Sequence, residues 1–276
     1  MIWMPSEKHS ATTFTLLDMR VTRLSTTAIK GFQLHHPQSI QITERGAVGD
    51  REFFLVDDNN AMVSITMEGD LVSFTSTYDA SKATLSILEN GAVVAQGNVN
   101  EGAAQAGNFF NAWDVDGNLI AGPWNELISE RLGRKVRLIK TSKARNGSDV
   151  EPLSLVSSAS VGALEESAQV GPIDARRFRM LIQVDGTGAH EEDTWVDQEF
   201  SIGSAIIRAG GPVKRCAATT RNPDSGIVDL KTLKLIGDYR GRQESRFGTG
   251  FNFGIYATCV QPGLISVGDE LIKLST

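Results

Sequence analysis

The chain has 276 residues and a mass of 29.8 kDa, enough for one large domain or two smaller ones. Hydrophobic residues make up 41% and charged residues 22%, which excludes a disordered, collagen-like or low-complexity protein. A net charge of −6 argues against nucleic-acid binding through bulk positive charge. The sequence has no apolar stretch of about 18 residues and no basic-then-apolar start, so we expect neither a membrane span nor a secretion signal.

The two cysteines, Cys216 and Cys259, do not form a disulfide framework or a C-x-x-C metal motif. We therefore expect two free thiols in a reducing compartment, the cytoplasm.

In chain order, residues favoured in β-strands (Val, Ile, Leu, Phe and Thr) concentrate in short segments bounded mostly by Gly, Asp or Asn. These segments are 14–24, 52–57, 83–88, 136–139, 180–184, 205–208 and 264–274. Helical spacing is rarer. It occurs at Trp124, Leu127, Ile128 and Leu132 ahead of Gly133, at Val161, Leu164 and Ala168 after Ser157 or Ser158 as N-cap, and at Leu230, Leu233 and Ile236 ahead of Gly237.

Because the strands do not alternate regularly with helices, the pattern disfavours a doubly wound parallel sheet. It predicts a mainly β fold with peripheral helices (α+β), a β-barrel or sandwich. The stretch 97–122 is rich in Gly, Ala and Asn, which is typical of a connection. We place a domain boundary there, giving domains 1–118 and 119–276.

Positive charge gathers in one part of the chain. Residues 205–246 hold nine Lys or Arg and four Asp or Glu, a local net charge of +5 that leaves −11 for the rest. Such a cluster suits a small anion, because Arg binds phosphate through two parallel hydrogen bonds. The alternative is a solvated basic face. A second basic run, 132–145, ends at residues 146–149 in what we expect to be a solvated loop.

Several familiar site motifs are missing. The glycines of 248–254 are not spaced as in a dinucleotide-binding fingerprint, and no phosphate-binding loop or nucleophile elbow occurs. The four histidines lack metal-ligand spacing. His190, Glu191, Glu192 and Asp193 could bind a hard cation, although an exposed acidic turn is the simpler interpretation.

The segment Pro212–Gly226 remains as the candidate for chemistry. Lys214 and Arg215 immediately precede Cys216, and neighbouring cations favour the thiolate form that serves as nucleophile or soft-metal ligand. Thr219, Thr220 and the turn that follows add hydroxyl and backbone donors for phosphate oxygens. The alternative is a buried, inert cysteine beside a surface turn.

The pattern Arg215-Cys216-x-x-Thr219-Thr220-x-x-Pro223-Asp224-x-Gly226 resembles the signature of MOSC domains, and most closely the subgroup of mitochondrial amidoxime-reducing components and their bacterial relatives. Further landmarks follow in the order of that family. They are Val21-Thr22-Arg23-Leu24, Ile29-Lys30-Gly31, Gly49-Asp50-Arg51-Glu52-Phe53, Arg177-Phe178-Arg179, Glu192-Asp193-Thr194-Trp195, Phe253-Gly254-Ile255-Tyr256 and residues 263–269. The resemblance covers nearly the whole chain from about residue 15, and implies an N-terminal MOSC-type β-barrel domain before the MOSC domain.

The resemblance implies that Cys216 is the thiolate ligand of a molybdenum–molybdopterin cofactor, and hence both catalytic and metal-binding. It also implies that the other matching positions hold the cofactor phosphate or line the pocket: Lys30, Arg51, Arg177, Arg179, Arg215, Thr219, Thr220 and Tyr256. Arg177 and Arg179 lie two residues apart, so on one strand they would share a face. Asp50 is expected to orient a neighbouring Arg, and Cys259 is expected in the core. The resemblance also implies pyridoxal phosphate binding.

The sequence departs from the closest relatives at three positions that bear on cofactor binding and substrate. Met180 and Leu181 stand where Pro-Asn is usual, and Lys214 replaces a small polar residue. The segment Ser64-Ile65-Thr66-Met67 also lacks an Arg and a Pro often found there.

The expected function is reduction of an N-hydroxylated substrate, such as an amidoxime, hydroxamic acid or hydroxylamine, at molybdenum. Electrons would come from a separate donor protein, since the chain has no haem, flavin or iron–sulfur motif. Two alternatives stay open. Cys216 could carry sulfur or cofactor to a partner, or the protein could be a cofactor-free interaction barrel.

Overall fold

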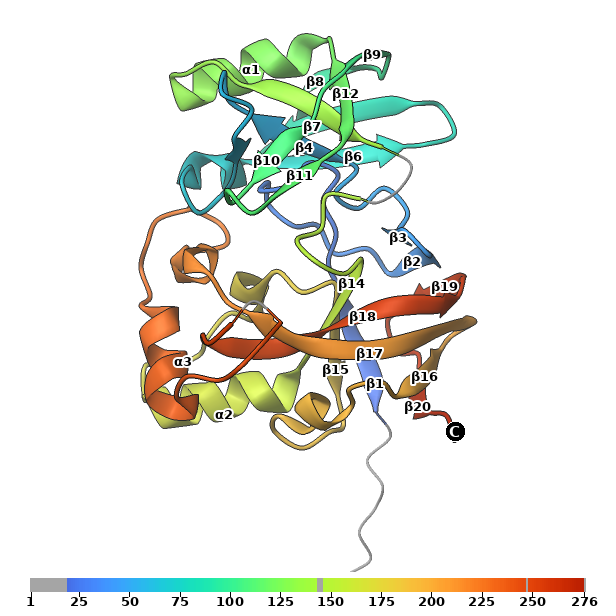
Figure 1. Cartoon of the computed structure of the whole chain (residues 1–276), viewed down its shortest axis with the longest axis vertical. Coiled ribbons are helices and arrows are strands. Elements are labelled where there is room, and N and C mark those ends of the chain that lie inside the picture. The colour runs from blue at the N-terminus through green and yellow to red at the C-terminus, as the bar shows by residue number, and fades with distance from the viewer. Residues whose placement is uncertain (1–18, 143–145, 247, 276) are drawn as a thin grey trace, which may run out of the picture.

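The computed structural model describes residues 19–142, 146–246 and 248–275. In Figure 1 the elements form two halves, one above the other. The lower half is built on a seven-stranded sheet. Its strands, in sheet order, are β1 (Arg20–Leu24), β15 (Ile182–Asp185), β14 (Leu153–Ser157), β18 (Asn252–Gln261), β17 (Ala205–Lys214), β16 (Glu199–Ile202) and β20 (Leu271–Lys273).

The seven-stranded sheet curls until its two edges nearly meet. Arg20 at the β1 edge forms an isolated antiparallel bridge to Glu270 beside β20, and the Val21 N–H donates to the Asp269 carbonyl at 2.9 Å. Along β17, buried Ala205, Ile207 and Ala209 alternate with more exposed residues, as expected when one strand face lines a core. This closure hides the edge strands and gives a nearly closed barrel.

A three-stranded ribbon extends this barrel, with β2 (Ser39–Thr43) between β19 (Gly263–Ser266) and β3 (Gly46–Ala47). Ile40 and Ile42 from β2 and Ile265 from β19 are buried in the barrel core. Both β1 and β2, which precede residue 44, thus pair with strands of the C-terminal half, β15 and β19.

The upper half holds a five-stranded and a three-stranded sheet, a hairpin and short helices (Figure 1). The five-stranded sheet runs β5 (Met62–Val63), β4 (Phe53–Val56), β13 (Arg137–Thr141), β12 (Gly117–Ile120) and β9 (Glu101–Ala104). The other elements are β6 (Phe74–Asp79), β7 (Thr84–Glu89) and β8 (Ala92–Asn98), the hairpin of β10 (Gly107–Phe109) and β11 (Trp113–Val115), the 3-10 helix η1 (Gly69–Ser73) and α1 (Pro123–Leu132).

Strand β4 is buried on both faces. Phe53 and Leu55 join the core beneath α1, where Trp124 is fully buried, whereas Phe54 and Val56 pack with Phe109 on the opposite face. A continuous apolar run is typical of a strand covered on both sides.

The three α-helices lie where the sequence predicts them. α1 ends at Gly133, which has φ +62°, and α2 (Ser158–Ala168) begins with Ser157 as N-cap, its side chain accepting from the Ser160 N–H. α3 (Thr232–Arg240) differs from the prediction, because it continues through Gly237 to Gly241. The Phe251 ring lies so close to Gly237 that an added Cβ would come within 2.7 Å of it, so this glycine serves packing and not termination.

The prediction of a mainly β fold with peripheral helices is confirmed. α2 and α3 pack on the lower sheet around Leu164, Ile236 and Phe253. The remaining 3-10 helices are η2 (Ala175–Phe178), η3 (Glu191–Thr194) and η4 (Ala217–Thr220). Predicted strand residues 14–18 lie outside the described residues.

The domain boundary near residue 118 stays a prediction. α1 and β13 lie beyond it in sequence, yet Trp124 and Leu138 belong to the core of the upper half. β1 and β2 lie before it, yet pair with β15 and β19 of the lower half.

Candidate functional site

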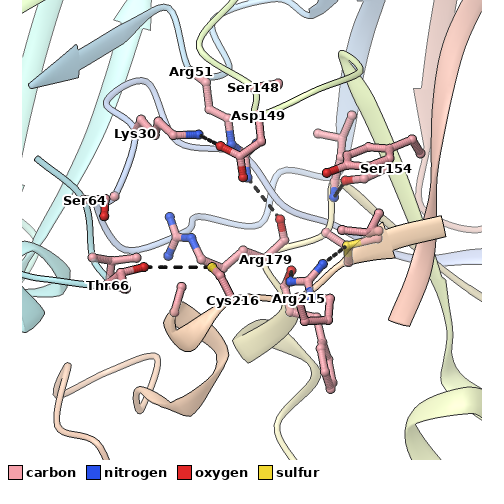
Figure 2. A pocket seen from close by; sticks show the side chains of 18 of the residues that line it. Lys30, Arg51, Ser64, Thr66, Ser148, Asp149, Ser154, Arg179, Arg215 and Cys216 are labelled. Atoms are coloured by element: carbon pink, nitrogen blue, oxygen red, sulfur yellow. Dashed lines mark hydrogen bonds and ion pairs between the residues drawn. The ribbon is translucent and has the colours of Figure 1, made fainter. Parts of the chain in front are cut away.

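A pocket of about 820 Å³, including its open mouth, lies between the two halves. Its charged lining residues come from both halves: Lys30, Arg51, Asp149, Arg179 and Arg215, which are labelled in Figure 2, and Glu151. Cys216 and Tyr256 also line it, together with the hydroxyls of Ser64 and Thr66.

Cys216 stands at the junction between β17 and η4, with an extended backbone, and its side chain is exposed. The Thr66 hydroxyl lies 3.9 Å from its sulfur, as Figure 2 shows. Arg221 holds this part of the upper half, donating to the carbonyls of Thr66 at 2.9 Å and Gly226 at 2.7 Å. The thiol therefore faces a segment from the opposite half of the molecule.

Arg179 and Arg215 bring two positive charges to the pocket with no carboxylate partner among the described residues. Arg179 donates to the Phe32 carbonyl at 2.7 Å, and Arg215 donates to the Phe178 carbonyl and to the Met180 sulfur at 3.3 Å. Burial, and next the charge of Arg51, lowers the pKa of Arg179 to about 9, which still leaves the guanidinium protonated at neutral pH. Burial also lowers the pKa of Arg215.

The other two cations, by contrast, are paired with carboxylates. Lys30 is 9% exposed and donates to the Gly147 carbonyl at 2.9 Å and to Asp149. Arg51 donates to the buried Asp50, which also accepts from the Thr27 N–H at 2.9 Å. The expected role of Asp50, orienting an Arg, agrees with this contact.

Ionisation of the pocket groups follows from burial and neighbouring charge. Burial opposes ionisation of Asp149, but the adjacent Lys30, together with the charges of Arg51 and Arg215, outweighs it and lowers the Asp149 pKa. Burial lowers the pKa of Lys30 and raises that of Tyr256, where the carboxylate of Asp149 adds to the effect. At neutral pH, Asp149 is therefore a carboxylate and Tyr256 a neutral phenol.

Three residues expected near the cofactor do not line the pocket. Arg177 is buried and pairs with Asp229 at 2.7 Å. The Thr219 hydroxyl donates to the Cys216 carbonyl at 3.0 Å and the Thr220 hydroxyl to the Ala217 carbonyl at 2.7 Å. These side chains hold the turn that presents the thiol.

The expectation that Arg177 and Arg179 share a strand face is wrong. Residues 175–178 form η2, and Arg179 follows with φ +51°, so the chain turns sharply between the two side chains. Lys214 also differs from the expectation, because its side chain packs along Gly250 and does not line the pocket. Arg179, distant in sequence, takes the place beside the thiol that Lys214 was expected to fill.

The interpretation of residues 146–149 as a solvated loop is wrong, since Asn146 and Gly147 are buried and Ser148 and Asp149 line the pocket, where Asp149 binds Lys30. Lys143 and Arg145 of the preceding basic run lie outside the described residues. Thr66 and Phe110 were also missed as pocket residues. The family resemblance pointed only to the segment that contains Thr66, and it gave no signal for Phe110, because only the packing of the two halves brings these residues to the pocket.

The acidic turn at residues 190–193 is used for structure. Glu192 is fully buried and accepts from the Ser160 hydroxyl at 2.7 Å, and Asp193 pairs with Arg240. Within the part of the chain that the structure describes, no group of three or more His, Cys, Asp or Glu residues is arranged to hold a metal ion. Cys259 packs against the barrel core.

Comparison with protein-family models matches residues 142–272 to the MOSC domain. This part of the chain is a MOSC domain. The matched region supplies part of the pocket lining, including Asp149, Arg179, Arg215, Cys216 and Tyr256. Other lining residues lie outside it: Lys30, Arg51, Thr66 and Phe110.

Curated relatives fall into two groups. The mitochondrial amidoxime reducing component 2 of Bos taurus is 32% identical over 130 residues, 46% of this chain and 38% of the relative. Component 1 of Mus musculus is 31% identical over 149 residues, 52% of this chain and 43% of the relative. The molybdenum cofactor sulfurase of Drosophila melanogaster is 28% identical over 256 residues, 88% of this chain and 31% of the relative. The matches thus span less than half the length of these relatives.

Two solved structures resemble the chain. YuaD from Bacillus subtilis is 11% identical with a TM-score of 0.44, covering 94% of this chain and 97% of that one. YiiM from Geobacillus stearothermophilus is 14% identical with a TM-score of 0.34, covering 64% and 74%. Within residues 19–142, 146–246 and 248–275, no helix has both the length and the apolar composition that a membrane span requires.

Proposed function

We propose that the protein binds a molybdenum–molybdopterin cofactor in the pocket between its halves and reduces N-hydroxylated compounds there. The observation that carries this proposal is the placement of the exposed thiol of Cys216 beside Arg179 and Arg215. Neither guanidinium has a carboxylate partner in the described chain, and the buried Nε of Arg215 lacks any hydrogen-bond partner there. The sulfur of Cys216 suits a soft metal, and the two guanidinium groups suit an anionic phosphate.

The pocket residues fit such a cofactor. Cys216 would supply the protein ligand to molybdenum, and Arg179 and Arg215 the charge-assisted donors to the phosphate, with Lys30 and Arg51 adding positive charge held in place by Asp149 and Asp50. We do not propose pyridoxal phosphate as a ligand, because the amine of Lys30, which lines the pocket, already binds Asp149 and the Gly147 carbonyl.

Reduction of an amidoxime breaks the N–O bond, takes up two electrons and two protons, and releases water and the amidine. The bound cofactor would supply the two-electron chemistry, and the electrons would come from a separate donor protein. This chain would orient the substrate and supply hydrogen-bond donors and acceptors. Because Asp149 stays ionised at neutral pH, it would orient the Lys30 ammonium and not deliver a proton, whereas the Tyr256 hydroxyl would remain a hydrogen-bond donor.

The test compares wild type with Cys216→Ala and, as a matched control, Cys259→Ala, all purified from cells with ample molybdenum cofactor. We expect near-stoichiometric molybdenum in wild type and Cys259→Ala, and benzamidoxime reduction with a chemical electron donor. The activity of Cys216→Ala should be lower than that of wild type by a factor of at least about 100. Substitution of a residue that only orients a metal ligand typically costs less than this. Folded wild type without molybdenum would refute the proposal.

A second candidate is a carrier of sulfur or cofactor that uses the same thiol. Two observations favour it: the match to a molybdenum cofactor sulfurase covers 88% of the chain, and Cys216 is exposed. Mass spectrometry of the intact protein distinguishes the candidates, because a carrier should show one extra sulfur atom on Cys216 that a reductant removes. Absence of both molybdenum and bound sulfur would leave the cofactor-free interaction barrel.

A further inference from the structure

Phe110 is a large aromatic residue at the mouth of the pocket. Its side chain lines the pocket and is 48% exposed, in contrast to the neighbouring Phe109, which is fully buried. Other apolar side chains that line the pocket, such as Phe178 and Met180, are buried, so Phe110 adds an exposed aromatic surface beside the charged and polar groups. Aromatic rings of this kind dominate the binding of planar apolar groups.

The backbone at this position is unfavourable for phenylalanine. Phe110 and Asn111 both have positive φ, +59° and +57°, in the turn of the β10–β11 hairpin that the Ala112 N–H closes on the Phe109 carbonyl at 3.0 Å. Turns with two positive φ values favour Asn or Gly at both positions. A bulky residue held in this conformation is uncommon, and such outliers cluster at binding sites.

The ring of Phe110 is fixed by its neighbours. Its centroid lies 6.1 Å from that of Phe109 and 5.9 Å from that of Trp113, both in edge-to-face geometry. Phe109 packs in turn against buried Phe54 at 5.1 Å. The exposed ring is thus anchored to the core of the upper half, and it would lose little conformational entropy on binding a ligand.

We propose that Phe110 is a specificity-determining residue that favours substrates carrying an aromatic group next to the N-hydroxylated centre. This inference rests on the proposed function and adds the substrate class. The ring would pack against the aromatic substituent at the mouth, while the N-hydroxyl group points toward Cys216 and the cations. Small aliphatic N-hydroxylated compounds would gain nothing from it.

The experiment compares benzamidoxime with acetamidoxime in wild type, Phe110→Asn and Phe110→Trp. Asn removes the ring and suits the positive φ, so the hairpin should fold, whereas Trp keeps an aromatic surface. We expect the ratio of kcat/KM for benzamidoxime over acetamidoxime to fall about five- to tenfold in Phe110→Asn, and to be retained in Phe110→Trp. Asn111→Gly, which alters the same turn without touching the ring, is the matched control and should keep the wild-type ratio.

Binding is measured separately by calorimetry with benzamidine and acetamidine, the reaction products, which need no electron donor. Benzamidine should bind wild type more tightly than acetamidine, and Phe110→Asn should remove the difference. If no reductase activity is found but benzamidine still binds more tightly than acetamidine only when Phe110 is present, the proposed function is refuted and the role of Phe110 in binding aromatic groups is supported. An unchanged preference in Phe110→Asn, or an equal loss for both compounds, would show that Phe110 only packs the hairpin.

Discussion

Arg179 shows how a single residue connects the two halves of the site. Its guanidinium enters the pocket and donates to the Phe32 carbonyl at 2.7 Å, while its own carbonyl accepts from Arg51 at 3.0 Å. The positive φ of +51° lets the backbone turn so that both contacts form. The residue therefore supplies charge and also fixes the position of a second cation.

Replacing Arg179 with Met should weaken retention of the cofactor about tenfold or more, because hydrogen bonds to charged groups contribute about 1.5–3 kcal/mol. The measurement is molybdenum per protein after dialysis, together with the melting temperature. Arg208→Met is the control, since Arg208 lies on β17 and pairs with Glu199 at 2.6 Å, outside the pocket. Equal molybdenum in both variants would contradict the assignment.

His190 should make stability depend on pH. Burial, and next the charge of Arg240, lowers its pKa to about 4, and neither ring nitrogen has a hydrogen-bond partner among the described residues. The unfolded chain, with a pKa near 6.5, binds the proton first. The folded state thus loses stability as pH falls from about 6.5 to about 4.

Urea unfolding of wild type and His190→Asn at pH 7.5 and pH 4.5 tests this. Asn accepts the positive φ of +59° at this position, but it loses the ring contacts with Tyr239 and Phe253. We expect lower stability at both pH values and a smaller difference between them. An unchanged difference would assign the acid sensitivity to other groups.

At the residue scale, sequence could identify Cys216 and Arg215 because they stand side by side in a motif. It could not identify Thr66 or Asp149, since Thr66 reaches the thiol and Asp149 reaches Lys30 only through long-range packing. Sequence adjacency also misled at Lys214, because this last residue of β17 directs its side chain along Gly250 and not into the pocket.

At the element scale, two glycines within helices differ in the space around them. Gly162 in α2 has no atom within 4 Å of an added Cβ, whereas Gly237 in α3 has the Phe251 ring at 2.7 Å. A sequence shows only that each residue is Gly, which explains why Gly237 was interpreted as a helix end. Spacing of apolar residues located both helices correctly, because it follows from the buried face.

Gly162→Ala should therefore stabilise the protein by about 0.5–1 kcal/mol through helix propensity. Gly237→Ala gains the same propensity but must displace Phe251, and we expect a net loss of about 1–3 kcal/mol from overpacking. Thermal and urea unfolding of the two variants give the comparison. Stabilisation by both substitutions would mean that the Phe251 ring moves aside without cost.

At the scale of the whole molecule, the lower barrel is incomplete without the start of the chain. β1 pairs with β15 and nearly closes the barrel, and β2 supplies Ile40 and Ile42 to its core. A fragment of residues 119–276 would expose these core surfaces. We predict no cooperative thermal transition for this fragment, measured by near-ultraviolet circular dichroism, in contrast to the full chain.

A cooperative transition of the fragment near the melting temperature of the full chain would instead support two independent domains divided near residue 118. The mainly β class was predictable because strand segments are short and apolar along the whole sequence. The pairing of β1 and β2 with strands of the lower barrel was not predictable, because the spacing of apolar residues along a segment does not indicate which distant segment it pairs with.

The pairing of β2 with β19, which joins Ile42 to Gly263, also orders events during synthesis. At about 5–20 residues per second, roughly 10–45 s separate the translation of these two partners. Throughout that interval β2 has only the two-residue strand β3 as a partner, and the wall of the pocket formed by the C-terminal half is incomplete. A cofactor held between the two halves would therefore enter only after translation has passed Gly263, so its binding would follow the synthesis of both walls of the pocket.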